Sequence, residues 1–443
     1  MENRRNAGIA QLVERNLAKV EIASSSLVSR SKIRKPDKIN SCPAFLLQGA
    51  LLHTTSLRWP SGHVLPDYGQ GGIYGLARSL RDWLHDPQAG CDAAEVAPGE
   101  PARIVLLVID GLGANFLQTI GAGSALQAHC RRTLTSVFPS TTASAITTLM
   151  TGASPAEHGL NGWFIHDQRF GGVIAPLPLE LRGNGPLEAF RLTQRLFPQP
   201  SMFHRAVRPV VMVSPQEIAF SPYSRHHARG ARVHPYGGRQ ELEDGIVEAV
   251  MGLGAAGGFV HAYYPRFDAV SHGYGCRSAH AQTCFARIDA MFARLCERLA
   301  GSGVRILVTA DHGFIDSAPE RTVQIAPDSA VAAMLAAPLW GERRLAFCSV
   351  KEGAKDEFEH WAAETLEGRA VLMSGADCIE SGLFGPGKPN TRLAERAGTH
   401  VLLMEPGWTI VDTVEGETPF DLIGVHGGLS ADEMRVPLVL ARL

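Results

Sequence analysis

Continuous runs of apolar residues, rich in β-branched side chains, recur along most of the chain. The first is RIVLLVID at 103–110, and similar runs occupy 210–213, 258–264, 304–309, 400–404 and 436–440. Short runs of this kind are typical of strands that are buried on both faces of a parallel sheet. Between them, most clearly at 280–300, the apolar positions follow a helical spacing. The alternation predicts a doubly wound α/β fold, with a mostly parallel sheet covered by helices.

Two stretches interrupt this alternation. Residues 163–200 are rich in Gly and Pro, and residues 314–398 follow the strand and helix pattern less well. We expect both to be insertions that build a small cap over the sheet. The main domain is therefore expected to span 65–443, with residues 1–64 as an N-terminal extension.

The N-terminal extension supports two interpretations. Residues 7–31, AGIAQLVERNLAKVEIASSSLVSRS, resemble the peptide that results when a transfer-RNA gene is translated. That resemblance favours a start codon that was assigned too far upstream. In that case the segment is expected to have no ordered structure. The alternative is a genuine amphipathic helix at 9–20 followed by a Ser-rich linker.

Composition and charge exclude several classes of protein. With 45% hydrophobic and 19% charged residues, the chain can bury a sizeable core. Its formal net charge of -2 provides no basic field for a nucleic-acid polymer or an anionic membrane. No apolar run approaches the roughly 20 residues that cross a bilayer, and no signal pattern is present, so we expect a cytoplasmic location. The eight cysteines form no CxxC pair and are expected to be free thiols.

The polar residues of most interest follow the apolar runs, at the sheet edge where open α/β sheets bind ligands. Each alone has an ordinary explanation, because an Asp after a strand is commonly a helix cap or turn former and an isolated His is commonly packed or exposed. Together they supply ligands for two divalent cations such as zinc. The candidates are Asp110, Thr142, Asp268, His272, Asp311, His312 and His426.

The order of these residues resembles the type I phosphodiesterase/nucleotide pyrophosphatase family of the alkaline phosphatase superfamily. The motifs are Pro-x-x-Thr at 139–142, Asp-x-x-x-His at 268–272, Asp-His at 311–312 and His-Gly at 426–427, and the resemblance covers about residue 65 to the carboxyl end. It implies an alkaline phosphatase-like fold and a small phosphorylated substrate. The expected reaction is hydrolysis of phosphate esters, above all phosphodiesters or nucleotide pyrophosphates, with two zinc ions as cofactors.

The resemblance also implies a role for each candidate. Thr142 would be the nucleophile and form a phospho-threonine, because coordination to a metal lowers the pKa of a threonine hydroxyl. Thr141 is the alternative hydroxyl. Since histidine ligands must be neutral, activity should fall below about pH 6. The implied ligand sets are Asp110, Asp311, His312 and the Thr142 oxygen for one ion, and Asp268, His272 and His426 for the other.

Two departures from the family pattern concern the substrate. Ala143 and Ala145 stand where nucleotide-cleaving members carry an aromatic residue that stacks on the base and an Asn that binds the phosphate. Tyr263 matches the second stacking residue, although a tyrosine at a strand end is often only packed. Nucleotide specificity is therefore in doubt. The missing phosphate donor would come from the cap, where the candidates are Asn161, Arg182 and Asn184.

Other functions remain as alternatives. A phosphomonoesterase would need a positive residue near the nucleophile, and a phosphonate hydrolase would use the same site. A sulfatase is disfavoured because that class needs a Cys or Ser in a Cys-x-Pro-x-Arg setting, and PSTT at 139–142 does not provide this setting. The non-enzymatic alternative is a metal-stabilised interaction module, against which the complete ligand set argues. The sequence leaves homo-oligomerisation open.

Overall fold

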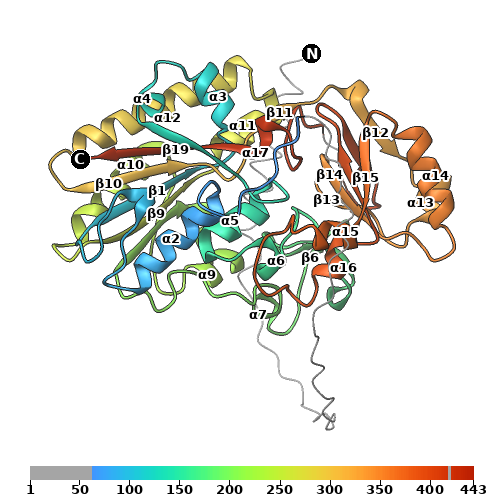
Figure 1. The fold of residues 1–443 in the computed structure, drawn as a ribbon, viewed down its shortest axis with the longest axis horizontal. Coiled ribbons are helices and arrows are strands. Elements are labelled where there is room, and N and C mark those ends of the chain that lie inside the picture. Colours follow the sequence, from blue (N-terminus) through green and yellow to red (C-terminus); the bar gives the residue numbers. More distant parts are fainter. Residues whose placement is uncertain (1–61, 418–420) are drawn as a thin grey trace, which may run out of the picture.

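A computed structural model of the chain describes residues 62–417 and 421–443. The expected helix at 9–20, and nearly all of the 1–64 extension, lie outside the described residues. The central feature is a seven-stranded sheet in the order β2-β19-β10-β1-β9-β7-β8. Figure 1 shows this sheet with helices around it and a second group of strands beside it.

The central sheet is mostly parallel, as the apolar runs predict. Five adjacent strands run parallel: β10 (Val304–Thr309), β1 (Arg103–Ile109), β9 (Gly258–Tyr264), β7 (Val210–Pro215) and β8 (Arg232–Tyr236). At the other edge, β19 (Arg435–Arg442) is antiparallel to β10, and β2 (Cys130–Thr135) is antiparallel to β19.

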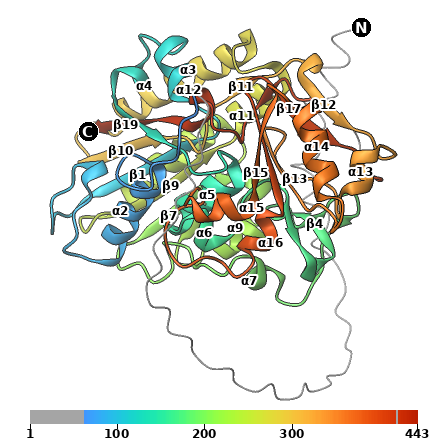
Figure 2. The same cartoon turned by 45° about the vertical axis from the view of Figure 1, so that its right-hand side comes forward.

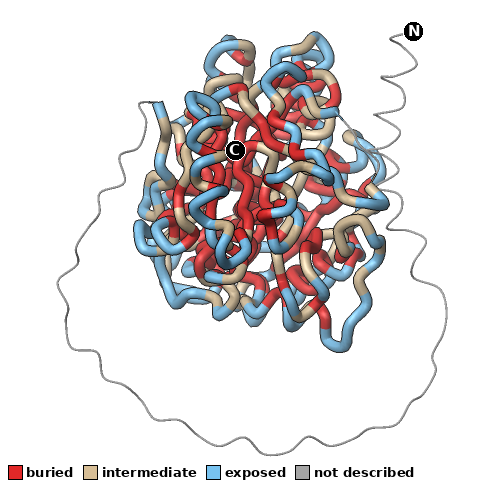
Figure 3. Tube along the Cα trace, turned by 90° about the vertical axis from the view of Figure 1, so that its right-hand side faces the viewer, coloured by how far each residue is buried: buried red, intermediate tan, exposed pale blue. Residues whose placement is uncertain are grey.

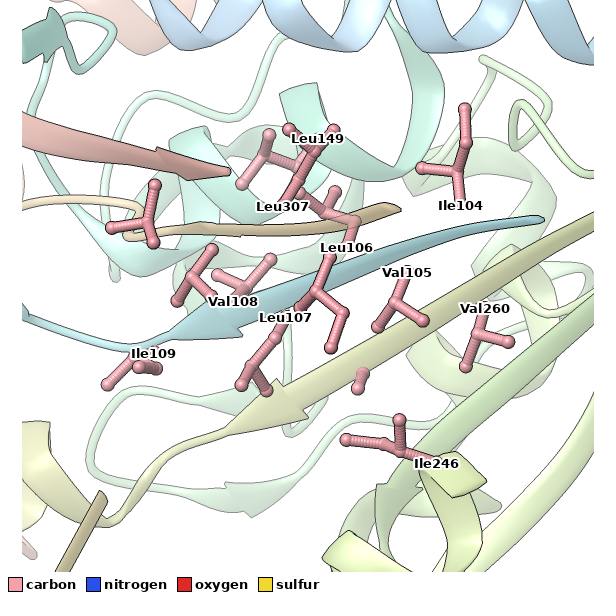
Figure 4. Close-up of a cluster of buried hydrophobic side chains, with 14 of the residues drawn as sticks. Ile104, Val105, Leu106, Leu107, Val108, Ile109, Leu149, Ile246, Val260 and Leu307 are labelled. Carbon is pink, nitrogen blue, oxygen red and sulfur yellow. The ribbon is translucent and has the colours of Figure 1, made fainter. Parts of the chain in front are cut away.

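Helices cover both faces of this sheet, which confirms the doubly wound α/β architecture. The face that carries α5 (Thr142–Thr151) also carries α2 (Ile73–His85), which packs against α5. The opposite face carries α10 (Arg239–Gly252) and α12 (Ala279–Arg298), which contact each other. Figure 4 shows Leu149 of α5 and Ile246 of α10 on opposite sides of β1.

The main core lies between the sheet and these helices. All six residues of β1 after Arg103 are buried, which explains why this strand is a continuous apolar run rather than an alternating one. Each fully buried side chain of this size contributes roughly 1.5–3 kcal/mol relative to an exposed one. In Figure 3 the buried segments accordingly run through the middle of the molecule, with exposed loops outside.

A second sheet of four antiparallel strands stands beside the central one and comes forward in Figure 2. It contains β13 (Trp340–Gly341), β14 (Leu345–Cys348), β15 (Ala370–Ser374) and β16 (His400–Met404). The prediction that 400–404 belongs to the central sheet was therefore wrong. All five residues of β16 are buried, and the apolar pattern of a buried strand does not distinguish between two sheets.

Smaller elements complete this side of the molecule. Helices α13 (Ala330–Met334) and α14 (Lys355–Thr365) share a hydrophobic cluster with the second sheet. Strand β12 (Thr322–Ile325) pairs with β17 (Thr409–Asp412). A third sheet has strands β3 (Ile165–Asp167), β4 (Gly172–Ala175), β5 (Glu180–Leu181) and β6 (Gly185–Pro186). The first stretch expected to form a cap thus contains a sheet of its own, and the second contributes strands to sheets that extend beyond residue 398. The domain boundaries stay a prediction.

Within residues 62–417 and 421–443, no helix combines the length and apolar character that a membrane crossing requires. The cysteines of the same residues are all free thiols, as the absence of a CxxC pair predicts.

Candidate metal centre and active site

The ends of three adjacent parallel strands position most of the candidate ligands. Asp110 directly follows β1, and Asp311 and His312 follow β10 after one further residue. Strand β9 leads into α11 (Arg266–Tyr274), which carries Asp268 and His272 one helical turn apart. Because β10, β1 and β9 are neighbours and parallel, their carboxyl ends bring these residues to one edge of the sheet.

The remaining two candidates come from other elements. Thr142 is the first residue of α5, and its hydroxyl oxygen lies 3.2 Å from Nε2 of His312. His426 follows the short strand β18 (Gly424–Val425), and its ring stacks on that of His312 with the centroids 3.7 Å apart. Strand β18 pairs with β11 (Ile315–Asp316). In Figure 1, α11 and β11 lie between the central and second sheets. The structure therefore brings all seven candidates together.

Three carboxylates converge at this edge: Asp110 and Asp311 are buried, and Asp268 is partly buried. Asp311 accepts hydrogen bonds from the backbone N–H groups of Gly111 and His312, both at 3.0 Å, through Oδ1 alone. Its Oδ2 has no hydrogen-bond partner among the described residues, and the same holds for Oδ1 of Asp110 and Oδ1 of Asp268. Burial, followed by repulsion from the neighbouring carboxylates, raises the pKa of both Asp110 and Asp268 well above the usual range. A cation bound here would remove both penalties.

The three imidazoles make the same kind of contact with the backbone. In each ring Nδ1 faces a backbone carbonyl oxygen, which favours a proton on Nδ1 and leaves the lone pair of Nε2 for a metal. Burial lowers the pKa of His272 to about 4 and that of His426 well below its usual value, so both rings are neutral near pH 7. The contacts are His272 to Gly424 O at 2.8 Å, His312 to Gly313 O at 3.0 Å and His426 to Ser140 O at 3.2 Å.

The ligand atoms form two groups that share a histidine. One comprises Asp110, Asp311 and His312, as the family resemblance implies. The other comprises Asp268, His426 and again His312. His272, which was assigned to this second set, has its Nε2 3.4 Å from Asp268 Oδ1 and lies at the edge of the group. Carboxylate oxygens and neutral imidazoles are suitable ligands for zinc and similar divalent ions, so the donor set fits a pair of metal ions.

The structure separates the two adjacent threonines. Thr141 is fully buried, and its hydroxyl donates a hydrogen bond to Glu342 rather than toward the metal ligands. The Thr142 hydroxyl, by contrast, faces His312. Of these two threonines, Thr142 is therefore the one whose hydroxyl faces a candidate metal ligand.

Tyr263 contributes in a way that the sequence did not indicate. Its hydroxyl donates a hydrogen bond to Asp110 Oδ2, opposite the unpartnered oxygen of that carboxylate. This contact holds the orientation of a candidate ligand. That Tyr263 stacks on a substrate stays a prediction.

The three cap residues offered as phosphate donors have other surroundings. The Asn161 amide donates to Arg396 O at 2.8 Å, and Asn161 is fully buried. Arg182 pairs with two carboxylates and also donates to a backbone carbonyl. Asn184 lies in an exposed turn. The donor groups of Asn161 and Arg182 are thus engaged within the protein.

The sequence reasoning missed a charged hairpin tip, formed by Glu342, Arg343 and Arg344 between β13 and β14. Arg344 is fully buried and forms two hydrogen bonds of 3.0 Å to the Glu433 carboxylate. Glu342 accepts from Thr141. The available signal was three consecutive charged residues immediately before a short apolar run, WGERRLAF at 340–347.

Comparisons with known proteins agree with this geometry. A family model described as type I phosphodiesterase/nucleotide pyrophosphatase matches residues 104–175 and 202–429. No curated protein sequence matches the chain at a significant level.

Two solved structures illustrate the similarity in fold. An inactive threonine-to-alanine variant of murine ectonucleotide pyrophosphatase/phosphodiesterase 5, in complex with AMP, is 16% identical with a TM-score of 0.58, over 76% of this chain and 87% of its own. Phosphonoacetate hydrolase from Sinorhizobium meliloti 1021, in complex with phosphonoacetate, is 17% identical with a TM-score of 0.56, over 78% of this chain and 91% of its own. With the family model covering most of its length, the chain belongs to the type I phosphodiesterase/nucleotide pyrophosphatase family and is a hydrolase of that class.

Proposed function

We propose that this protein is a two-metal hydrolase of small phosphodiesters or nucleotide pyrophosphates, with zinc as the metal and Thr142 as the nucleophile. One observation carries the proposal: the Thr142 hydroxyl lies beside a set of buried carboxylates and imidazoles whose free donor atoms converge. A non-catalytic module would have no use for a hydroxyl aimed at the ligand atoms.

The arrangement suggests how the residues divide the reaction. Thr142 begins α5, where the first backbone N–H groups lack partners within the helix and favour a negative phosphoryl group. The Thr142 hydroxyl would lose its proton to solvent and its oxygen would attack phosphorus in line. The bond to the leaving alcohol or phosphate oxygen would break, with that oxygen keeping the electron pair, and a phospho-threonine would form. Water would then cleave the phosphorus–oxygen bond of that intermediate and regenerate the hydroxyl. Bound metal ions would supply charge neutralisation for the attacking and leaving oxygens.

The candidate ligand residues are held in position before substrate binds. Asp311 is fixed by two backbone N–H groups and Asp110 by the hydroxyl of Tyr263, so both present one free oxygen in a defined direction. The backbone carbonyls behind the imidazoles orient each Nε2 in the same way. Such preorganisation removes the need to reorient charged groups during the reaction.

The related structures support a small phosphorylated substrate. The two neighbours described above were solved with AMP and with phosphonoacetate. Ala143 and Ala145 leave this chain without the residues expected to bind a nucleobase and the phosphate, so a compact ester or phosphonate is as suitable a substrate as a nucleotide.

A substrate panel tests the proposal. Zinc-loaded protein should hydrolyse a p-nitrophenyl phosphodiester, a p-nitrophenyl phosphonate monoester or a nucleotide pyrophosphate, and a chelator should abolish the activity. Metal analysis should give close to two equivalents of zinc, in keeping with the two ligand groups. Absence of hydrolysis of every substrate by fully metal-loaded protein would contradict the proposed function.

The nucleophile is tested by substitution. Thr142→Ala should retain the fold and the metal, since the Asp and His side chains remain, while kcat falls by a factor of about a thousand or more. Thr142→Ser, which keeps a hydroxyl, should retain measurable activity. If Thr142→Ala were almost as active as the wild type, direct attack by water would replace the covalent mechanism.

A further inference from the structure

Glu342 lies between the two segments that carry Thr142 and His426. Its carboxylate accepts a hydrogen bond from Thr141, the residue before the proposed nucleophile. Its side chain also packs against Gly427, the residue after His426, where an added Cβ would come 2.7 Å from the Cβ of Glu342. These contacts place a carboxyl group from the hairpin of the second sheet beside the residue that precedes the proposed nucleophile and beside the residue that follows His426.

The carboxyl group is held in one orientation. Its Oε1 accepts a second hydrogen bond, from the backbone N–H of Trp163 at 2.8 Å. Two residues further on, the side chain of Arg344 forms two parallel hydrogen bonds with Glu433, which anchors the same hairpin from its other side. Two donors on one oxygen, together with this anchor, fix the position of the Glu342 charge.

The surroundings of the hairpin do not supply a surplus of positive charge. Arg343 adjoins Glu342 but has further carboxylates as electrostatic neighbours, and Arg182 is engaged in ion pairs. In the described part of this region, three guanidinium groups thus stand among five carboxylates: Arg182, Arg343 and Arg344, with Glu342, Asp412, Glu417, Asp421 and Glu433.

The charge of Glu342 also acts on one of the candidate metal ligands. Burial and the charge of Asp311 are the larger causes of the raised pKa of Asp268, and Glu342 adds to them. Its charge therefore reaches the space in which the phosphoryl group would bind.

We propose that Glu342 is a specificity-determining residue, whose fixed negative charge disfavours doubly charged phosphate monoesters relative to singly charged phosphodiesters. This inference rests on the proposed function. Above about pH 6 a monoester carries close to two negative charges, whereas a diester carries one. A like charge beside the phosphoryl group penalises the monoester more, and such repulsive elements are a common source of specificity. A monoesterase would need a positive residue in this place.

Two substrates with the same leaving group isolate the effect of charge. We would measure kcat/KM for p-nitrophenyl phosphate and for methyl p-nitrophenyl phosphate, with zinc-loaded wild type and Glu342→Gln. The assay is run at about pH 8.5, because burial raises the pKa of Glu342 only to about 7 and the wild-type side chain is then ionised. Glutamine keeps an acceptor for Thr141 and Trp163, so the substitution removes charge but not the contacts. The monoester-to-diester ratio of kcat/KM should rise by about tenfold or more.

Two control variants separate charge at this position from other effects. Glu342→Asp retains the charge and should keep a ratio close to that of the wild type. Glu248→Gln removes one charge from the exposed side of α10 and should leave the ratio within about twofold. If Glu342→Gln does not fold, Glu342→Ser provides the same removal of charge in a smaller side chain.

The outcomes distinguish the inference from the proposed function. An unchanged ratio in folded, metal-loaded Glu342→Gln would overturn the specificity role, even if diesters are hydrolysed well. A wild-type enzyme that prefers the monoester would overturn it too. Failure of the wild type to hydrolyse any ester would instead remove the proposed function itself.

Discussion

Two sets of buried charged groups lie close together in this protein, and they differ in how completely they are paired. Asp110, Asp268 and Asp311 each keep one oxygen without a hydrogen-bond partner among the described residues. Glu433 is fully buried, yet both of its oxygens are bonded: to Arg344, to the Ser430 hydroxyl and to a backbone N–H.

The pKa values respond in opposite directions. Burial and mutual repulsion raise the pKa of Asp110 and Asp268. Burial alone would also raise the pKa of Glu433, but the charge of Arg344 and the surrounding hydrogen bonds outweigh it and lower the pKa. Burial of a carboxylate therefore does not indicate function. A buried carboxylate with an oxygen left unbonded is a better indication, because an unpaired buried charge is costly and calls for a further partner.

The largest effect on stability should come from breaking the paired set. Arg344→Met leaves Glu433 buried without its cation and should reduce the free energy of unfolding by about 3–5 kcal/mol. Chemical denaturation of metal-loaded protein measures the change. The control is Arg442→Met, which breaks the exposed pair between Arg442 and Glu95 and should cost about 1 kcal/mol or less. Equal effects of the two substitutions would contradict the comparison.

Removing a charge from the unpaired set should instead raise the free energy of unfolding when metal is absent. In the presence of a chelator, Asp110→Asn relieves repulsion and should raise the free energy of unfolding by about 1 kcal/mol or more. In zinc, the same variant should lose much of the stabilisation that metal gives the wild type, because one ligand is gone. A metal-free variant less stable than the metal-free wild type would show that the carboxylates do not repel each other.

A smaller effect should appear in the pH dependence of the metal-free protein. The folded state holds protons on Asp110 and Asp268 more tightly than the unfolded chain, so these two groups reduce stability as pH rises above about 4. Glu433, with a lowered pKa, has the opposite sign and loses its contribution as pH falls below about 4.3. In urea unfolding, the free energy of unfolding of Asp110→Asn relative to that of the wild type should therefore rise between about pH 4 and pH 8. Parallel curves would contradict this assignment.

The sequence was most informative where a function follows directly from position along a buried strand. Asp110 and Asp311 could be predicted because parallel strands end at one edge of the sheet. Asp268 and His272 are four residues apart, which places both on one side of a helix. The choice between Thr141 and Thr142 rested on a family pattern. The structure gives it a physical basis, since one hydroxyl is buried against Glu342 and the other faces His312.

Other features depend on tertiary contacts that no local pattern encodes. Glu342 meets Thr141 across 201 positions of the chain, and the apolar run of β16 does not reveal which sheet it joins. The expected loss of activity below about pH 6 used the unperturbed pKa of histidine. Burial lowers the pKa of His272 to about 4, so protonation of this residue does not set that limit.

The close approach of Gly427 and Glu342 also limits how this site can change during evolution. Gly427 has a φ of +113°, and even an alanine there would bring its Cβ within 2.7 Å of the hairpin of the second sheet. Any larger residue after His426 would therefore require that hairpin to move away, and the charge of Glu342 would move with it. A relative that acquires a side chain at this glycine should thus also show an altered hairpin, so that metal binding and substrate preference would be inherited together rather than separately.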